Sequence, residues 1–168
     1  MKIKIFITGG TIDNIDYDSV AKFPKNPITF IPALLKQSRI KTNFDIEILM
    51  MKDSRFITDE DRRIILRNCK KCKEDRIIIT HGTMTMPITA KFLGNSSLNK
   101  TIVLTGSAVP AIKKKSDALF NLGFAFSAVQ LLPKGVYVVM NGEIFLWNNV
   151  RKNLKTGFFD KEKIINQK

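Results

Sequence analysis

The stretch Phe6-Ile7-Thr8-Gly9-Gly10-Thr11-Ile12 decides the fold of this chain, because an apolar strand runs there into two glycines and a threonine. Polar and apolar residues alternate from Lys2 to Ile7, which predicts a β-strand. The two glycines allow the backbone to turn where a Cβ would not fit. Thr11 would stand at the carboxyl end of the strand, where a hydroxyl can cap a turn, bind an anion or act as a nucleophile. The motif alone leaves these three roles open.

Strand patterns and helix patterns alternate along the rest of the chain. Short apolar runs predict strands at 44–50, 76–80, 101–104 and 135–140. Capping residues and helical spacing predict helices at 29–38, 58–73, 85–93 and 116–132. Asn141-Gly142 is a hairpin signal that leads into a returning strand at 143–146. This order predicts an α/β fold, with a doubly wound, mostly parallel sheet and helices on both faces (three-layer, flavodoxin-like), plus a C-terminal hairpin.

Polar residues follow four of the predicted strands. Thr11 follows the first strand, and Asp53 and Ser54 follow the second. Thr83 follows the third strand and Ser107 follows the fourth. In a doubly wound sheet the ligand crevice lies beyond the carboxyl ends of the strands, so we expect one crevice to hold these side chains. Each could instead cap a helix or satisfy a turn amide, which is the commoner role of such residues.

The length of 168 residues suits a single domain over residues 1–168. Residues 13–27 are polar, include two prolines and are expected to form a mobile lid loop, and residues 153–168 are expected to form a basic tail. No run approaches the roughly eighteen apolar residues of a membrane-spanning helix. The start is too short and too alternating for a signal peptide, so we expect a cytoplasmic protein.

The net charge of +13 raises the question of an acidic partner. Lysines are scattered along the whole chain, and only Lys113-Lys114-Lys115 is contiguous. No aromatic residues are interleaved at stacking spacing, and no basic amphipathic helix is present. This distribution argues against a nucleic-acid or membrane partner and favours a solvated, lysine-rich surface.

The sequence offers no complete metal site. Cys69 and Cys72 are the two cysteines and His81 is the single histidine, so a four-ligand zinc site cannot be completed. We interpret the cysteines as free thiols and expect no metal or other cofactor. His81 follows a buried strand, which favours a hydrogen-bonded structural histidine over a general base.

Two separated threonine motifs carry a family resemblance. Thr8-Gly9-Gly10-Thr11-Ile12 is the first, and Thr80-His81-Gly82-Thr83, followed by Thr85-Met86, is the second. With these motifs the chain resembles the bacterial-type L-asparaginase family, and more closely its short form that has only the N-terminal domain. Further similar segments occur in the same order as in the family: Thr105-Gly106-Ser107-Ala108-Val109-Pro110, Ser116-Asp117-Ala118-Leu119-Phe120-Asn121-Leu122, Val139-Met140-Asn141-Gly142 and Val150-Arg151-Lys152-Asn153.

The resemblance implies an amidohydrolase that converts asparagine, or a related ω-amide, to the acid and ammonia. Thr11 would attack the amide and form an acyl-enzyme that water then hydrolyses. Thr83 and Lys152 would activate the reaction by relaying a proton, and Tyr17 on the lid loop would assist Thr11. The residues expected to line the substrate site are Gly10, Asp53, Ser54, Gly82, Met84 and Ser107. The apolar helix predicted from Ser116 favours a homodimer or a higher homo-oligomer.

Met84 departs from the family pattern His-Gly-Thr-Asp-Thr, in which the aspartate receives the α-ammonium of the substrate. Asp53, or Asp13 or Asp16 from the lid, could supply a carboxylate instead. Two further functions stay open. One is a binding or regulatory protein that has lost catalysis through Met84, and the other is a basic nucleic-acid-binding domain whose affinity falls steeply with salt.

Overall fold

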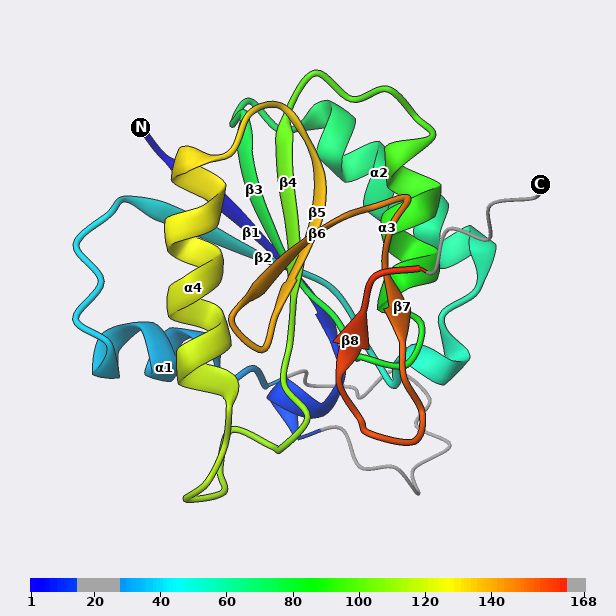
Figure 1. Cartoon of the computed structure of the whole chain (residues 1–168). Helices are drawn as coiled ribbons and strands as arrows, with labels where there is room; N and C mark the ends of the chain where they lie inside the picture. The colour runs from blue at the N-terminus through cyan, green and yellow to red at the C-terminus, as the bar shows by residue number, and fades with distance from the viewer. Residues whose placement is uncertain (15–27, 163–168) are drawn as a thin grey trace.

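The computed structural model describes residues 1–14 and 28–162, and a six-stranded sheet runs through its centre (Figure 1). The strands of this sheet are β1 (Ile3–Gly9), β2 (Phe44–Lys52), β3 (Arg76–Thr80), β4 (Thr101–Thr105), β5 (Gly135–Met140) and β6 (Glu143–Leu146). Their spatial order is β2-β1-β3-β4-β5-β6, with β1 to β5 parallel and β6 antiparallel to β5. The order of the parallel strands is that of flavodoxin-like folds. The predicted α/β fold is therefore confirmed.

Helices cover both faces of the sheet in the described part of the chain: α1 (Ile31–Gln37), α2 (Asp59–Lys71), α3 (Met86–Gly94) and α4 (Ala118–Leu131). α1 and α4 pack on the face that receives Ile3, Ile5 and Ile7 of β1. α2 and α3 pack on the opposite face, which receives Phe6. Because side chains alternate along a strand, β1 contributes to both cores and is buried along its whole length. The central strand is thus fixed from both sides, together with the loop that follows it.

The start of α2 shows the predicted N-cap. The Thr58 hydroxyl accepts a hydrogen bond from the backbone N–H of Asp61 at 3.3 Å, and the Asp61 carboxylate accepts one from the backbone N–H of Thr58 at 2.9 Å. The Asp61 carboxylate also accepts two bonds from Lys52 Nζ, at 2.7 and 2.8 Å. This pairing connects the helix to the carboxyl end of β2.

Two other predicted caps are wrong. α1 begins at Ile31 with Phe30 as its N-cap residue, and Thr29 lies outside the helix. The Thr29 hydroxyl accepts from the backbone N–H of Ile31 at 3.2 Å and donates to Asp13 Oδ1 at 2.7 Å. Thr85 is the N-cap residue of α3, but its side chain does not cap the helix, because the hydroxyl donates to the carbonyl of Ser54 at 2.6 Å. At Thr85 a bond to a neighbouring loop has replaced the local cap, whereas Thr29 bonds to the start of α1 from one residue before the N-cap.

The C-terminal region contains one predicted hairpin and one that was not predicted. Asn141 and Gly142 have φ of 57° and 81° and connect β5 to β6, as the sequence signal indicated. A second, two-stranded sheet pairs β7 (Arg151–Lys152) with β8 (Phe159–Asp160). These strands have two residues each, so the sequence showed no alternation there.

The last long helix has one buried and one exposed apolar face. Leu122, Ala125 and Val129 of α4 are buried in the core, whereas Phe120 and Leu131 are 62% and 83% exposed.

None of the helices within residues 1–14 and 28–162 has the length and apolar content needed to cross a bilayer.

Candidate active site

Three loops at the carboxyl ends of β1, β2 and β3 are in close contact. Gly10 follows β1 with φ of +85°, and a Cβ at this position would collide with the backbone of Gly82 after β3. A Cβ on Gly82 would in turn lie 2.7 Å from both Cβ and Oγ of Ser54, after β2. Glycine is therefore required at both positions, because the neighbouring loop leaves no room for a Cβ. This contact brings the predicted site residues together.

A small cavity lies where these loops meet. Its volume is about 10 Å³, close to what a single water molecule requires. The residues that line it come from all three loops: Gly10, Thr11, Asp53, Ser54, Gly82, Thr83 and Met84. Most of the residues predicted for the site thus share one cavity.

The hydroxyls of Thr11 and Thr83 have no hydrogen-bond partner among residues 1–14 and 28–162. Thr11 is the first residue of a 3₁₀ turn, η1 (Thr11–Asp13), in which its carbonyl accepts from the backbone N–H of Asn14 at 3.0 Å. Thr83 is buried, at 6% exposure, and precedes α3 without capping it. Neither hydroxyl satisfies a helix end, so both are available to a molecule in the cavity.

Among the described residues, Asp53 is the one acidic residue in the cavity lining. Both oxygens of its carboxylate are hydrogen-bonded to Arg55. Its Oδ1 accepts from the backbone N–H of Arg55 at 2.8 Å and from Arg55 Nε at 3.2 Å. Its Oδ2 accepts from Arg55 Nη2 at 2.9 Å. The turn η2 (Ser54–Phe56) folds the arginine back onto the aspartate. Asp53 thus faces the cavity as half of an ion pair.

Comparison with known proteins identifies the family. Residues 2–160 match the family profile described as "Asparaginase, N-terminal". The chain belongs to the asparaginase family.

Several members of this family are similar over most of the chain. The glutaminase-asparaginase of Acinetobacter glutaminasificans is 34% identical over 170 residues, which cover 90% of this chain and 50% of that protein. A glutamyl-tRNA(Gln) amidotransferase component from Methanococcus vannielii is 34% identical over 151 residues, which cover 84% of this chain and 34% of that protein. The chain therefore spans between about a third and a half of the length of these relatives.

Solved asparaginase structures share the fold. L-asparaginase I from Vibrio cholerae matches with a TM-score of 0.80 and 28% identity, over 95% of this chain and 51% of that one. The thermostable L-asparaginase from Thermococcus kodakarensis matches with a TM-score of 0.78 and 28% identity, over 96% of this chain and 51% of that one. The family resemblance expected from the two threonine motifs is confirmed.

His81 is a structural residue of this asparaginase domain. The carbonyl of Gly82 can only accept, so Nδ1 of His81 carries the proton and donates to it at 2.8 Å. In the neutral ring Nε2 is then an acceptor, and the Thr89 hydroxyl donates to it at 2.9 Å while accepting from Arg62 Nε–H at 3.2 Å. Burial lowers the pKa of His81 to about 4, so the ring is neutral. The structural interpretation of this histidine is confirmed, and its bond orients Gly82 at the cavity.

Lys152 of the asparaginase domain lies on β7, outside the cavity lining. Its ammonium donates to the carbonyl of Gly157 and lies 4.6 Å from the centre of the Phe159 ring. Desolvation lowers the pKa of Lys152, and the Asp117 carboxylate opposes this change. The group is thus biased toward the neutral form that a proton acceptor needs.

The other predicted residues are absent from the cavity lining or lie outside the described chain. Ser107 is buried after β4, and its hydroxyl has no partner within the described ranges. Asp13 is also buried, and its Oδ1 accepts from the Thr29 hydroxyl and from the backbone N–H of Phe30 at 2.9 Å. Desolvation raises the pKa of Asp13, although these bonds lower it. Tyr17 and Asp16 lie outside the described residues.

Arg55 and Thr85 are the site residues that sequence reasoning missed. Thr85 bonds to Ser54 through both its hydroxyl and its backbone N–H, the latter at 3.4 Å from Ser54 Oγ. Arg55, two residues after Asp53, bonds to the Asp53 carboxylate through its backbone N–H and its guanidinium. An aspartate that accepts from the backbone N–H two residues later is a recognised turn signal, so this contact could have been anticipated.

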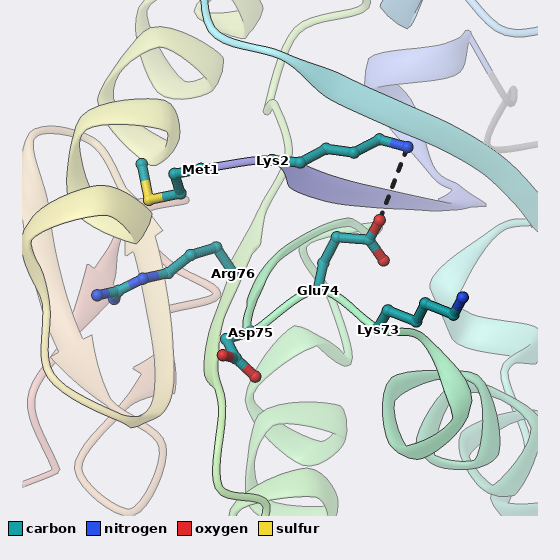
Figure 2. Close-up of a pocket in the computed structure, with 6 residues that line it drawn as sticks. All are labelled: Met1, Lys2, Lys73, Glu74, Asp75 and Arg76. Carbon is teal, nitrogen blue, oxygen red and sulfur yellow. Dashed lines mark ion pairs between the residues drawn. The ribbon is translucent and has the colours of Figure 1, made fainter.

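A second, larger hollow lies near the amino ends of β1 and β3, at the opposite end of these strands from the cavity. It measures about 410 Å³ and is lined by Met1, Lys2, Lys73, Glu74, Asp75 and Arg76. Figure 2 shows Lys2 reaching Glu74, and the two charges are 3.7 Å apart. This hollow contains neither serine nor threonine, so we place the site in the smaller cavity. Within the described ranges, no three His, Cys, Asp or Glu side chains are grouped to hold a metal ion.

Proposed function

We propose that this protein is an amidohydrolase that hydrolyses the ω-amide of a small carboxylic acid, such as asparagine, through an acyl-enzyme on Thr11. The observation that supports this most strongly is the shared cavity of Thr11 and Thr83 in a chain of the asparaginase family. Both hydroxyls face the cavity without a partner in the described chain. A nucleophile and the group that activates it must meet in this way.

In the first half of the proposed reaction, Thr11 Oγ forms a bond to the amide carbon and the C–N bond breaks. The hydroxyl proton passes through Thr83 to the leaving nitrogen, which departs as ammonia. In the second half, water attacks the ester carbon, the acid leaves and Thr11 regains its proton. Backbone N–H groups of the loops that carry Thr11 and Thr83 would stabilise the oxyanion in both steps.

Lys152 is proposed to accept this proton from Thr83 and to return it through Thr83 to the leaving nitrogen. Its lowered pKa supports this role. Its ammonium bonds to the Gly157 carbonyl, so the relay requires Lys152 to exchange this partner for Thr83. Tyr17 is proposed to assist Thr11 from the lid, and Ser54 to bind the carboxylate of the substrate.

The test is ammonia release from asparagine, glutamine and other ω-amides. Thr11→Val removes the hydroxyl but keeps the side-chain shape, and kcat/KM should fall about a hundredfold or more. Thr42 stands before β2, away from the cavity, and Thr42→Val is the matched control that should leave kcat/KM unchanged. Absence of ammonia release from every amide would refute the proposal.

The second candidate is a binding or regulatory protein. Met84 in the cavity lining and the ion-paired state of Asp53 favour it, because both weaken the pocket for an amino acid. On this hypothesis the wild type is inactive and Met84→Asp creates turnover. Activity of the wild type would exclude it.

We further propose that the protein self-associates in the cytoplasm. The exposed Phe120 and Leu131 of α4 support self-association. The free thiols of Cys69 and Cys72 suit a reducing compartment. Sedimentation of wild type and Leu131→Ser would test the assembly.

A further inference from the structure

We propose that the residues lining the cavity select amides that carry a carboxylate but no α-ammonium group, such as succinamate, over amino-acid amides such as asparagine. This inference names the substrate class of the proposed amidohydrolase and rests on that function. Succinamate and asparagine share the reacting amide and the distal carboxylate. They differ only in the ammonium on the carbon next to the carboxylate.

The first observation is that the cavity has no carboxylate free to pair with an ammonium among the described residues. Asp53 lines the cavity, but Arg55 bonds to both of its oxygens, at 2.8 to 3.2 Å. The Asp53 side chain of this ion pair is nearly buried, at 10% exposure. An ammonium could use this carboxylate only by displacing a bidentate, charge-assisted contact.

The second observation is the chemistry of the remaining wall. Met84 presents a thioether, which is a weak acceptor and carries no charge. Thr11, Ser54 and Thr83 present hydroxyls, and the two glycines present backbone. A cation moved from water into this wall without an anionic partner loses hydration that the wall does not replace.

The third observation concerns Asp13, the next carboxylate along the chain from Thr11. It is buried and does not line the cavity. Its Oδ1 accepts from Thr29 and Phe30, whereas its Oδ2 has no partner within the described ranges. Asp13 therefore holds the loop after β1 from outside the cavity lining. The anionic end of a substrate meets no such obstacle, because the hydroxyls of Thr11, Ser54 and Thr83 in the lining can donate to it.

The experiment compares kcat/KM for succinamate and asparagine, and for glutaramate and glutamine, by ammonia release. Loss of one charge-assisted hydrogen bond predicts a preference of about tenfold or more for the amide without the ammonium. Met84→Asp should invert the preference, whereas the apolar control Met84→Leu should preserve it. Arg55→Met releases the Asp53 carboxylate and should raise the use of asparagine relative to succinamate.

Equal use of the two amides by the wild type, or preference for asparagine, overturns the inference while the proposed function stands. If no amide yields ammonia, the proposed function fails, and calorimetric binding of the products then decides the inference. Succinate and aspartate differ by the same ammonium. Tighter binding of succinate supports the inference, and tighter binding of aspartate, equal binding or no binding of either overturns it.

Discussion

Replacement of Gly82 by alanine should destabilise the protein through contact with a single neighbour. The new Cβ would lie 2.7 Å from Ser54 Cβ, whereas non-bonded carbons prefer about 3.5 to 4.0 Å. One loop must move by close to 1 Å, and overpacking of this kind costs about 1 to 3 kcal/mol. We expect the free energy of unfolding of Gly82→Ala to fall by this amount in urea titrations. Movement of the loop would also misplace Thr83, and kcat/KM should fall about a hundredfold.

A double-mutant cycle tests the stated cause. Ser54→Gly removes both atoms that the new Cβ meets at 2.7 Å, so the double variant should recover at least about 1 kcal/mol relative to the sum of the single changes. Gly123→Ala is the matched control, because a Cβ at Gly123 in α4 meets nothing within 4 Å. It should stabilise the helix by about 0.5 to 1 kcal/mol. Additive behaviour of Gly82→Ala and Ser54→Gly would refute the contact argument.

Thr58, His81 and Arg76 lie outside the cavity lining, and their substitution or protonation should change the stability of the fold. Thr58→Ala should lower the free energy of unfolding by about 1 kcal/mol in urea, and Thr58→Ser should restore most of it. Burial lowers the pKa of His81 to about 4 in the folded protein. Between pH 6.5 and pH 4 the unfolded chain therefore binds more protons than the folded one. The free energy of unfolding should fall by about 3 kcal/mol as the pH drops through that window. NMR signals of this single histidine should stay in the neutral form down to about pH 5, and titration near pH 6.5 would contradict the burial. Arg76→Met removes hydrogen bonds to two carbonyls at the end of α4 and should lower the free energy of unfolding by about 2 kcal/mol. Arg63 is exposed and ion-paired, and Arg63→Met should lower it by less than about 1 kcal/mol.

The sheet could be predicted from sequence because each strand carries a strong local pattern. The apolar runs at 76–80 and 135–140 coincide with β3 and β5, and the predicted strand at 44–50 is β2 without its last two residues. The flavodoxin-like class predicted from these patterns has the strand order that the structure shows, and right-handed crossovers place the helices on both faces. The pair β7 and β8 could not be predicted, since a strand of two residues has no period.

The site could be predicted only in part, because contacts between loops leave no periodic signal. Strand order placed Thr11, Ser54 and Thr83 in one crevice, and they line one cavity. The hydroxyl of Thr85 and the guanidinium of Arg55 bond to the neighbouring loop residues Ser54 and Asp53, and no spacing rule ranks such bonds above a cap or a solvated charge. These loop contacts bear most directly on which substrate is accepted.

The carboxylate of Asp13 joins residues from both sides of the segment 15–27. It belongs to the turn after β1 and accepts bonds from Thr29 and Phe30, just before α1. Both attachment points of that segment are therefore set by one buried group that belongs to the scaffold. Substitution of Asp13 should therefore loosen the turn after β1 and the start of α1 together, because one side chain serves both.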